Sequence, residues 1–183
     1  MPNYRRNRVP GGTFFFTVNL LDRGSDLLVV QIAALRLAVW KARKKAPFHI
    51  DAWVVLPDHM HCIWTLPDAD ADFPSRWKAI KTAFSKSMPA PEAPLGTTLR
   101  HGERGIWQRR YWEHTIRDDR DYANHMDYTH FNPVKHGLVD HPADWVFSSF
   151  RHCVASGIYP ADWAGGECQV AEGATLFRPT SNT

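Results

Sequence analysis

The chain has 183 residues, of which 44% are hydrophobic, so it is long enough for one well-buried domain but short for two. Its three cysteines have no regular spacing, which argues against a disulfide framework and against a structural zinc site. No signal peptide or membrane-spanning apolar run is visible, so we expect a cytoplasmic protein with no membrane partner.

The predicted elements follow the order βαββαβ. We expect a strand at 13–20, a helix at about 25–45, two strands within 48–66, a helix at 74–87 and a strand near 111–117. Ser25 and Pro74 stand where a helix cap and a first-turn proline belong. This order predicts an α+β, ferredoxin-like (RRM-like) antiparallel sheet with both helices on one face.

One domain is expected over residues 1–183, with a core at about 12–139 and a wrapping tail at about 140–183. Large apolar residues in a polar background would anchor that tail on the core: Trp145, Phe147, Phe150, Tyr159 and Trp163.

His59 and His61 are separated by one apolar residue, directly after a turn-like Pro-Asp pair. Side chains two residues apart on a strand share a face, so both imidazoles can reach one metal ion. A His-x-His on a strand can equally be packed or solvated. The neighbours that point to the other face are better partners for the helices: Met60, Cys62 and Trp64. The two histidines are therefore expected on the free face of the sheet.

A polar helix face is predicted after residue 118. His125, Tyr128, Asn132 and Lys135 fall at i, i+3, i+7 and i+10, which puts a phenol and an amide one turn apart. Asn132 can alternatively cap a short second helix that starts at the following proline and ends at Gly137. His125 is a candidate proton acceptor for Tyr128, although a histidine there can also be polar filler.

Basic residues concentrate in the first part of the chain. Residues 1–110 hold 17 Lys or Arg against 9 Asp or Glu, whereas residues 111–183 hold 5 against 10. The basic part is the expected nucleic-acid surface. Within it, Arg5, Arg6 and Arg8 form an arm before the first strand that suits phosphate contacts or insertion into a hairpin groove.

A second basic segment interleaves cations with aromatic rings, as single-stranded nucleic acid binding requires. Its members are Arg104, Trp107, Arg109 and Arg110, followed by Tyr111 and Trp112. The two tryptophans can equally belong to the core. Other cations end one helix or line the next: Lys41, Arg43, Lys44, Lys45, Arg76, Lys78, Lys81 and Lys86. The cluster at 41–45 can instead complement the helix dipole and solvate the surface.

Four stretches carry a resemblance to a known family. They are LPDHMH at 56–61, IWQRRYWEH at 106–114, YTHFNPVKHGLV at 128–139 and WVFSSF at 145–150. In this order they resemble single-tyrosine transposases of the HUH endonuclease superfamily, most closely REP-associated tyrosine transposases. Each stretch is loose by itself, but four in register are specific, and the resemblance spans roughly residues 12 to 165.

The resemblance implies cleavage and rejoining of single-stranded DNA at REP-type hairpins. His59 and His61 would bind a divalent cation, with Asn132 as third ligand, and Tyr128 would be the nucleophile that forms a 5′-phosphotyrosine. The cation would be Mg²⁺ or Mn²⁺, and imidazole ligands favour Mn²⁺ in vitro. The helix carrying Tyr128 must then be an added C-terminal catalytic helix on the free sheet face.

The resemblance further implies a bacterial, nucleoid-associated protein whose partner is single-stranded or hairpin DNA, as a monomer or a homodimer. Lys135 would join the arginines and Trp107 as a DNA contact. Two other classes stay open: a non-catalytic single-stranded nucleic-acid-binding module, and a metal-dependent phosphodiesterase that uses water. The aromatic ribonucleoprotein motifs of RNA-recognition folds are missing, and simple binding gives a His-x-His with a distant Tyr-x-x-x-Asn no role.

Overall fold

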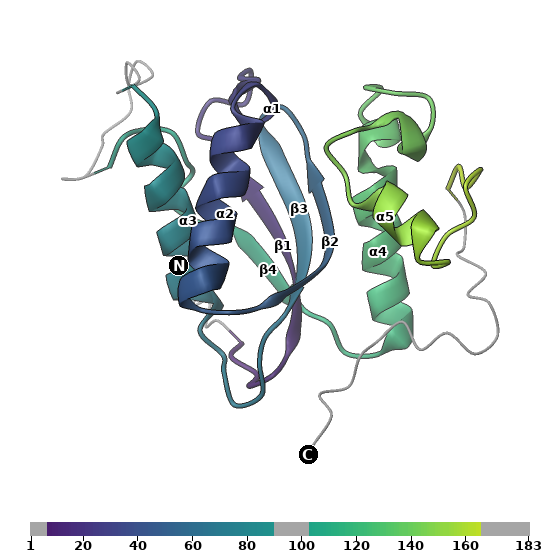
Figure 1. Ribbon diagram of the computed structural model, residues 1–183, viewed down its shortest axis with the longest axis horizontal. Coiled ribbons are helices and arrows are strands. Elements are labelled where there is room, and N and C mark those ends of the chain that lie inside the picture. The colour runs from purple at the N-terminus through teal and green to yellow at the C-terminus, as the bar shows by residue number, and fades with distance from the viewer. Residues whose placement is uncertain (1–6, 90–102, 166–183) are drawn as a thin grey trace, which may run out of the picture.

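The structure, a computed structural model, describes residues 7–89 and 103–165. A four-stranded antiparallel sheet of strand order β2-β3-β1-β4 forms its centre, with helices on both faces (Figure 1). The elements are β1 (Thr13–Asn19), α1 (Leu27–Val30), α2 (Ile32–Lys45), β2 (His49–Val55), β3 (His59–Thr65), α3 (Phe73–Ser87), β4 (Trp112–Thr115), α4 (Asp119–Lys135), the 3-10 turn η1 (Pro142–Asp144) and α5 (Phe150–Ala155). The predicted α+β, ferredoxin-like fold is confirmed.

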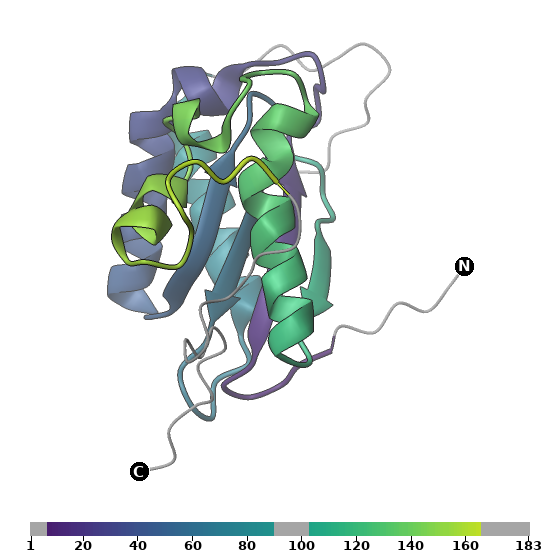
Figure 2. The same cartoon turned by 90° about the vertical axis from the view of Figure 1, so that its right-hand side faces the viewer.

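Alternation along the strands separates the two faces of the sheet. On β3, Met60, Cys62 and Trp64 point into a core shared with α2 and α3. Successive side chains on a strand point to opposite faces, so His59 and His61 lie on the other side, as predicted. α4 covers that side, and Figure 2 shows it lying over the sheet with α5 on one side and β4 on the other.

The helix-side core is built around a pair of stacked indoles. Trp64 and Trp77 are fully buried, with ring centroids 4.2 Å apart and planes inclined by 17°. Phe16 meets the Trp77 ring edge-on at 5.4 Å. Offset and edge-on aromatic pairs add to the free energy gained by burial. This pair therefore joins α3 to the sheet that carries His59 and His61.

Replacing Trp77 with Ala should lower the free energy of unfolding by about 3–5 kcal/mol, because the cavity cannot collapse around a rigid sheet. Urea unfolding followed by circular dichroism measures this loss. Trp40, which is 56% exposed on α2, is the matched control. Trp40→Ala should change the stability by less than about 0.5 kcal/mol. Equal losses in the two variants would contradict this assignment of the core.

The segment after α4 closes the second core. Phe150, Tyr159 and Trp163 pack with Phe15 of β1 and Ile63 of β3. The segment as far as Trp163 therefore packs on the sheet, while the division into a core at about 12–139 and a wrapping tail at about 140–183 stays a prediction.

Residues 147–149 also run beside β2. The Val55 N–H donates to the Phe147 carbonyl and the Ser149 N–H to the Trp53 carbonyl, both at 2.8 Å. The edge of the sheet at β2 is thereby covered.

The helix predicted at 25–45 is divided in two. The backbone at Gln31 (φ −105°, ψ 33°) leaves helical geometry between α1 and α2. The N-cap position of α1 belongs to Asp26 rather than Ser25, although the Ser25 Oγ accepts a hydrogen bond from the Leu27 N–H at 3.2 Å. Pro74 stands in the first turn of α3, as predicted. In the part of the chain that the structure describes, no helix combines the length and apolarity that crossing a membrane requires.

α4 continues through its proline. The alternative that Asn132 caps a separate helix is therefore wrong, because Asn132 and Pro133 both lie inside α4. A proline this close to the C-terminus removes one hydrogen bond, while the His136 N–H still donates to the Asn132 carbonyl at 3.0 Å. Gly137 follows with a φ of 67°, and the Leu138 N–H reaches back to the Pro133 carbonyl at 3.0 Å.

Arg76 is buried rather than on the surface, which corrects its grouping with the exposed cations. Its guanidinium pairs with the Asp70 carboxylate at 2.6 Å. It also donates to the carbonyl oxygens of Ala46, Pro47 and Asp72. With these acceptors a buried guanidinium is satisfied. Arg76 therefore ties the loop before β2 to α3 and is not available to bind DNA.

Candidate functional site

His59 and His61 lie side by side beneath α4. Their ring centroids are 5.0 Å apart, and the side chains are only 5% and 3% exposed. Each ring is held through its Nδ1: Asp58 Oδ1 lies 2.7 Å from the His59 Nδ1, and Thr17 Oγ1 lies 2.9 Å from the His61 Nδ1. Such supporting contacts fix ring orientation and leave Nε2 as the nitrogen for a ligand.

Tyr128 and Asn132, one turn apart on α4, meet the two histidines. The Tyr128 ring centroid lies 5.1 Å from that of His61, and the phenol is 40% exposed. Lys135, the next residue along this face, places its Nζ 5.0 Å from the centroid of the Tyr128 ring. Asn132 is fully buried. The structure thus brings Tyr128, Asn132 and Lys135 of the predicted helix face to the predicted histidine pair.

Three polar atoms at this meeting point have no hydrogen-bond partner among the residues that the structure describes. They are the His61 Nε2 and both side-chain amide atoms of Asn132. A buried polar atom left unsatisfied costs about 1–3 kcal/mol. Imidazole nitrogen and amide oxygen are both ligands for divalent cations. The donor set of His59, His61 and Asn132 therefore fits the cation that the resemblance implies.

Burial keeps both histidines in the neutral form that a metal ligand requires. It is the main cause that lowers the pKa of His61 to about 3, and the nearby His59, His136 and Lys135 lower it too. The Asn132 side chain has the opposite effect and raises the pKa of His61. The two side chains are close but are not aligned for a hydrogen bond. Burial also lowers the pKa of His59, against the raising effect of Asp58.

The stability should fall as the pH is lowered. Burial lowers the pKa of His61 and that of His130 to about 3, from an ordinary 6.5. Between these values the unfolded chain binds protons that the folded chain does not. Each histidine therefore removes up to about 1.4 kcal/mol of the unfolding free energy per pH unit below 6.5. Urea unfolding at a series of pH values tests this. His130→Gln should reduce the dependence of the unfolding free energy on pH by the contribution of one histidine. An unchanged dependence would contradict the lowered pKa of His130.

Several residues at the site were not singled out from the sequence. Phe15 of β1 packs against both His61 and Tyr128, at 5.5 and 5.8 Å between centroids. His136, which follows α4, lies 5.2 Å from His59. The alternation of β1 indicates that Phe15 and Thr17 share a face, but only strand pairing shows that this face is that of the histidines.

The predicted DNA contacts are placed unevenly. Arg5 and Arg6 lie outside the described residues, and Arg8 is exposed. Trp107 is partly buried on the helix side, with its ring 5.3 Å from that of Phe84. In the same segment Arg110 is exposed, and the Arg104 Nη2 donates to the Met88 carbonyl. Arg109 Nε pairs with the Glu103 carboxylate at 2.9 Å.

His125 lies one turn before Tyr128, and Phe15 contacts both rings. Its Nδ1 donates to the Asp121 carbonyl at 2.8 Å, since a carbonyl can only accept. The Asp121 carboxylate also lies 2.8 Å from the His114 Nε2, and the three side chains together form a potential cation-binding group. Proton acceptance by His125 stays a prediction, for which its Nε2 is the available atom.

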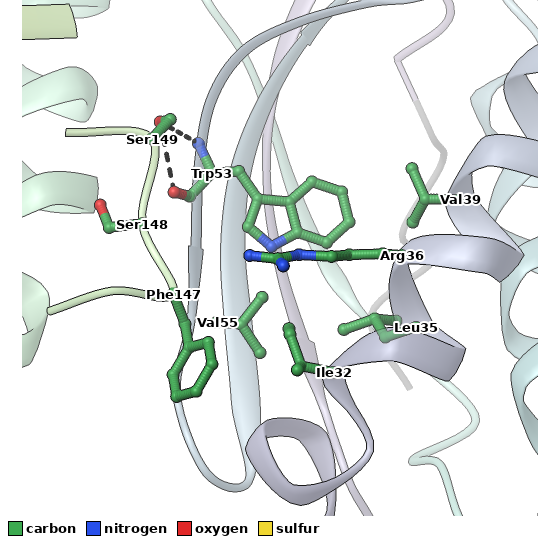
Figure 3. Close-up of a pocket in the computed structure, with 9 residues that line it drawn as sticks. All are labelled: Ile32, Leu35, Arg36, Val39, Trp53, Val55, Phe147, Ser148 and Ser149. Carbon is green, nitrogen blue, oxygen red and sulfur yellow. Dashed lines mark hydrogen bonds between the residues drawn. The ribbon is translucent and has the colours of Figure 1, made fainter. Parts of the chain in front are cut away.

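A cavity of about 200 Å³ lies at the β2 edge on the opposite face of the sheet from His59 and His61. Figure 3 shows Arg36 extending from α2 toward Trp53, with Phe147 at the other wall. None of the candidate site residues within 7–89 and 103–165 lines it. The cavity is separate from the chemistry described above.

Comparison with known proteins gives the family. No family model matches the chain. A REP-associated tyrosine transposase from Escherichia coli (strain K12) is 50% identical over 177 residues, which cover 97% of this chain and 99% of that relative. The chain belongs to the REP-associated tyrosine transposases. A Haemophilus influenzae (strain Rd) protein that carries the same family name is 43% identical over 166 residues, covering 90% of this transposase and 94% of the relative.

A solved structure supports the same membership. It is described as a REP-associated tyrosine transposase bound to a REP hairpin, and it is 48% identical to this chain with a TM-score of 0.80. The match covers 97% of this chain and 100% of that one. The resemblance that four short stretches of sequence indicated is therefore confirmed for the whole fold of this transposase.

Proposed function

We propose that this transposase cleaves and rejoins single-stranded DNA next to REP-type hairpins, with Tyr128 as the nucleophile. The observation that carries the proposal is the 5.1 Å approach of the Tyr128 ring to His61 within one chain. The similar solved structure is of a family member bound to a REP hairpin, and this favours the same class of DNA here. Because the two rings come from one chain, we propose that each protomer assembles its own site.

In this proposal the Tyr128 hydroxyl attacks the phosphorus of one phosphodiester. The phosphate becomes linked to tyrosine and the 3′ hydroxyl of the neighbouring nucleotide leaves. His125 is the proposed acceptor of the phenol proton, through Nε2. A divalent cation, Mg²⁺ or Mn²⁺, held by His59, His61 and Asn132 would polarise a phosphoryl oxygen and offset its negative charge.

The surrounding residues support this chemistry. The Lys135 ammonium contacts the Tyr128 ring and can stabilise negative charge on the phenol or the phosphate. Asp58 and Thr17 keep the two imidazoles in place, so little reorganisation is needed when DNA arrives. Because the link to tyrosine keeps the phosphate activated, rejoining needs no nucleotide cofactor.

A hairpin oligonucleotide with a single-stranded flank tests the proposal. The DNA is incubated with the protein and Mn²⁺ and is run on a denaturing gel, with the label at its 3′ end or at its 5′ end. A 5′-phosphotyrosine places the 3′-end label on the protein and releases the 5′-end label in a free fragment. Cleavage with no covalent species would favour a phosphodiesterase that uses water, and binding with no cleavage would favour a binding module.

A further inference from the structure

The sheet face that α4 covers carries, at its β4 edge, an exposed aromatic side chain that the proposed chemistry does not use. Trp112, the first residue of β4, is 51% exposed. It pairs across the strands with Thr17, which in turn pairs with His61. Neighbouring strands are about 4.8 Å apart, so Trp112 stands roughly 10 Å from His61 in the same row of the sheet.

Trp112 is supported from behind by a stack of rings. Its indole stacks on His114 at 5.8 Å with an interplanar angle of 6°. His114 stacks on His125 at 4.6 Å and 15°. Phe15, which touches Tyr128, meets the Trp112 ring edge-on at 5.7 Å. The exposed ring is thereby held in one orientation, and Phe15 contacts both this ring and that of Tyr128.

Asp121 holds this stack together. One carboxylate oxygen accepts from the His114 Nε2 at 2.8 Å, and the other lies 3.0 Å from the His125 Nδ1. The Arg117 N–H donates to the carboxylate as well, at 3.0 Å. Both imidazole rings donate an N–H to the carboxylate or the main-chain carbonyl of Asp121. In this arrangement the potential cation-binding group of His114, Asp121 and His125 is joined by hydrogen bonds and supports the ring stack.

A fixed, half-exposed aromatic ring beside a phosphate-binding site is what an unpaired nucleobase stacks on. Cationic charge for the adjoining phosphate is present at Lys135, over the Tyr128 ring. We propose that Trp112 is the stacking platform for an unpaired nucleobase that flanks the phosphate attacked by Tyr128, and that His114, His125 and Asp121 position it. This inference rests on the proposed function, since it takes Tyr128 as the point of cleavage.

Equilibrium binding tests the platform without cleavage. In a Tyr128→Phe background, the affinity for a labelled hairpin with a single-stranded flank is measured by fluorescence anisotropy. Trp112→Ala should lower the affinity roughly 5- to 150-fold, the usual effect of losing one stacked base. Trp112→Phe keeps an aromatic face and should lose much less. The control is Trp40→Ala, which removes an equally exposed indole from α2 on the opposite face and should leave the affinity unchanged.

An abasic scan identifies the partner base. Single abasic sites are introduced one at a time along the flank. At one position the loss of the base should weaken binding by the same factor as Trp112→Ala, and the two changes together should weaken it no further. Asp121→Asn should weaken binding of intact DNA and have no effect on DNA that lacks this base. If the effects of Trp112→Ala and of every abasic site are additive, or if Trp112→Ala has no effect, the platform is refuted.

The result is separable from the proposed function. A protein that forms the covalent species but shows no coupling between Trp112 and any base retains the proposed function and loses the platform. A protein that shows the coupling but never forms the covalent species has the platform without the cleavage. Thermal unfolding of each variant shows whether its fold is intact.

Discussion

Replacing Tyr128 with Phe should abolish the covalent protein–DNA species, with at least about a thousandfold loss of cleavage rate. The substitution removes one oxygen and keeps the ring contacts to His61 and Phe15. Because the phenol is 40% exposed, folding and DNA affinity should be unchanged. The denaturing gel measures the covalent species, and anisotropy measures the affinity.

Tyr122 is the matched control for this substitution. It lies on the same helix, but its hydroxyl donates to Asp51 at 3.3 Å. Tyr122→Phe should leave the covalent species in place and cost about 0.5–1.5 kcal/mol of stability. A covalent species that survives in Tyr128→Phe, or that disappears in Tyr122→Phe, would assign the nucleophile elsewhere.

Replacing His61 with Ala should remove Mn²⁺ binding and cleavage together. Of the two candidate imidazole ligands, His61 is the one that contacts the Tyr128 ring. Among the described residues, its Nε2 has no hydrogen-bond partner and is therefore open to a cation. We expect the Mn²⁺ affinity, measured by isothermal titration calorimetry without DNA, to fall more than about 100-fold, beyond the usual loss when only a supporting residue is removed.

Thr17→Val tests a smaller change at the same histidine. It removes the hydroxyl that lies 2.9 Å from the His61 Nδ1 and keeps the size of the side chain. The Mn²⁺ affinity should fall about 10- to 100-fold, with a smaller loss of cleavage than in His61→Ala. His49, which lies 53% exposed at the start of β2, is the control histidine. Unchanged Mn²⁺ affinity in His61→Ala would place the cation at another site.

Local patterns in the sequence predict much of the fold and of the site. The alternation of apolar residues around His59 and His61 predicts the face on which they lie, because one face must meet the helices. Helical spacing likewise predicts that Tyr128 and Asn132 share a face. Both patterns depend only on residues that are close in sequence, and the geometry of a strand or a helix fixes on which face each of these residues lies.

Features that depend on distant contacts could not be predicted this way. The sequence predicts that Arg76 is an exposed cation. Its burial depends on the carbonyl groups of Ala46 and Pro47, in the loop before β2, which only the folded chain brings to the guanidinium. Trp107 and Trp112 both read as stacking candidates or as core. Strand pairing with β1 decides that Trp112 faces the site, whereas Trp107 packs on α3. α4 likewise continues through Pro133, with Asn132 fully buried inside the helix, where the sequence left a separate capped helix open.

The segment that covers the β2 edge also supports α4 from behind. Ser149 bonds to the backbone of Trp53 and lies 3.0 Å from the His130 Nε2, so one residue joins the outermost strand to the helix of Tyr128. Tyr159 reaches the same helix by donating to Asp127 at 2.7 Å. The chain that follows α4 thus returns to support the helix of Tyr128, the proposed nucleophile, and shortening the protein after α4 would loosen that side chain rather than remove a dispensable extension.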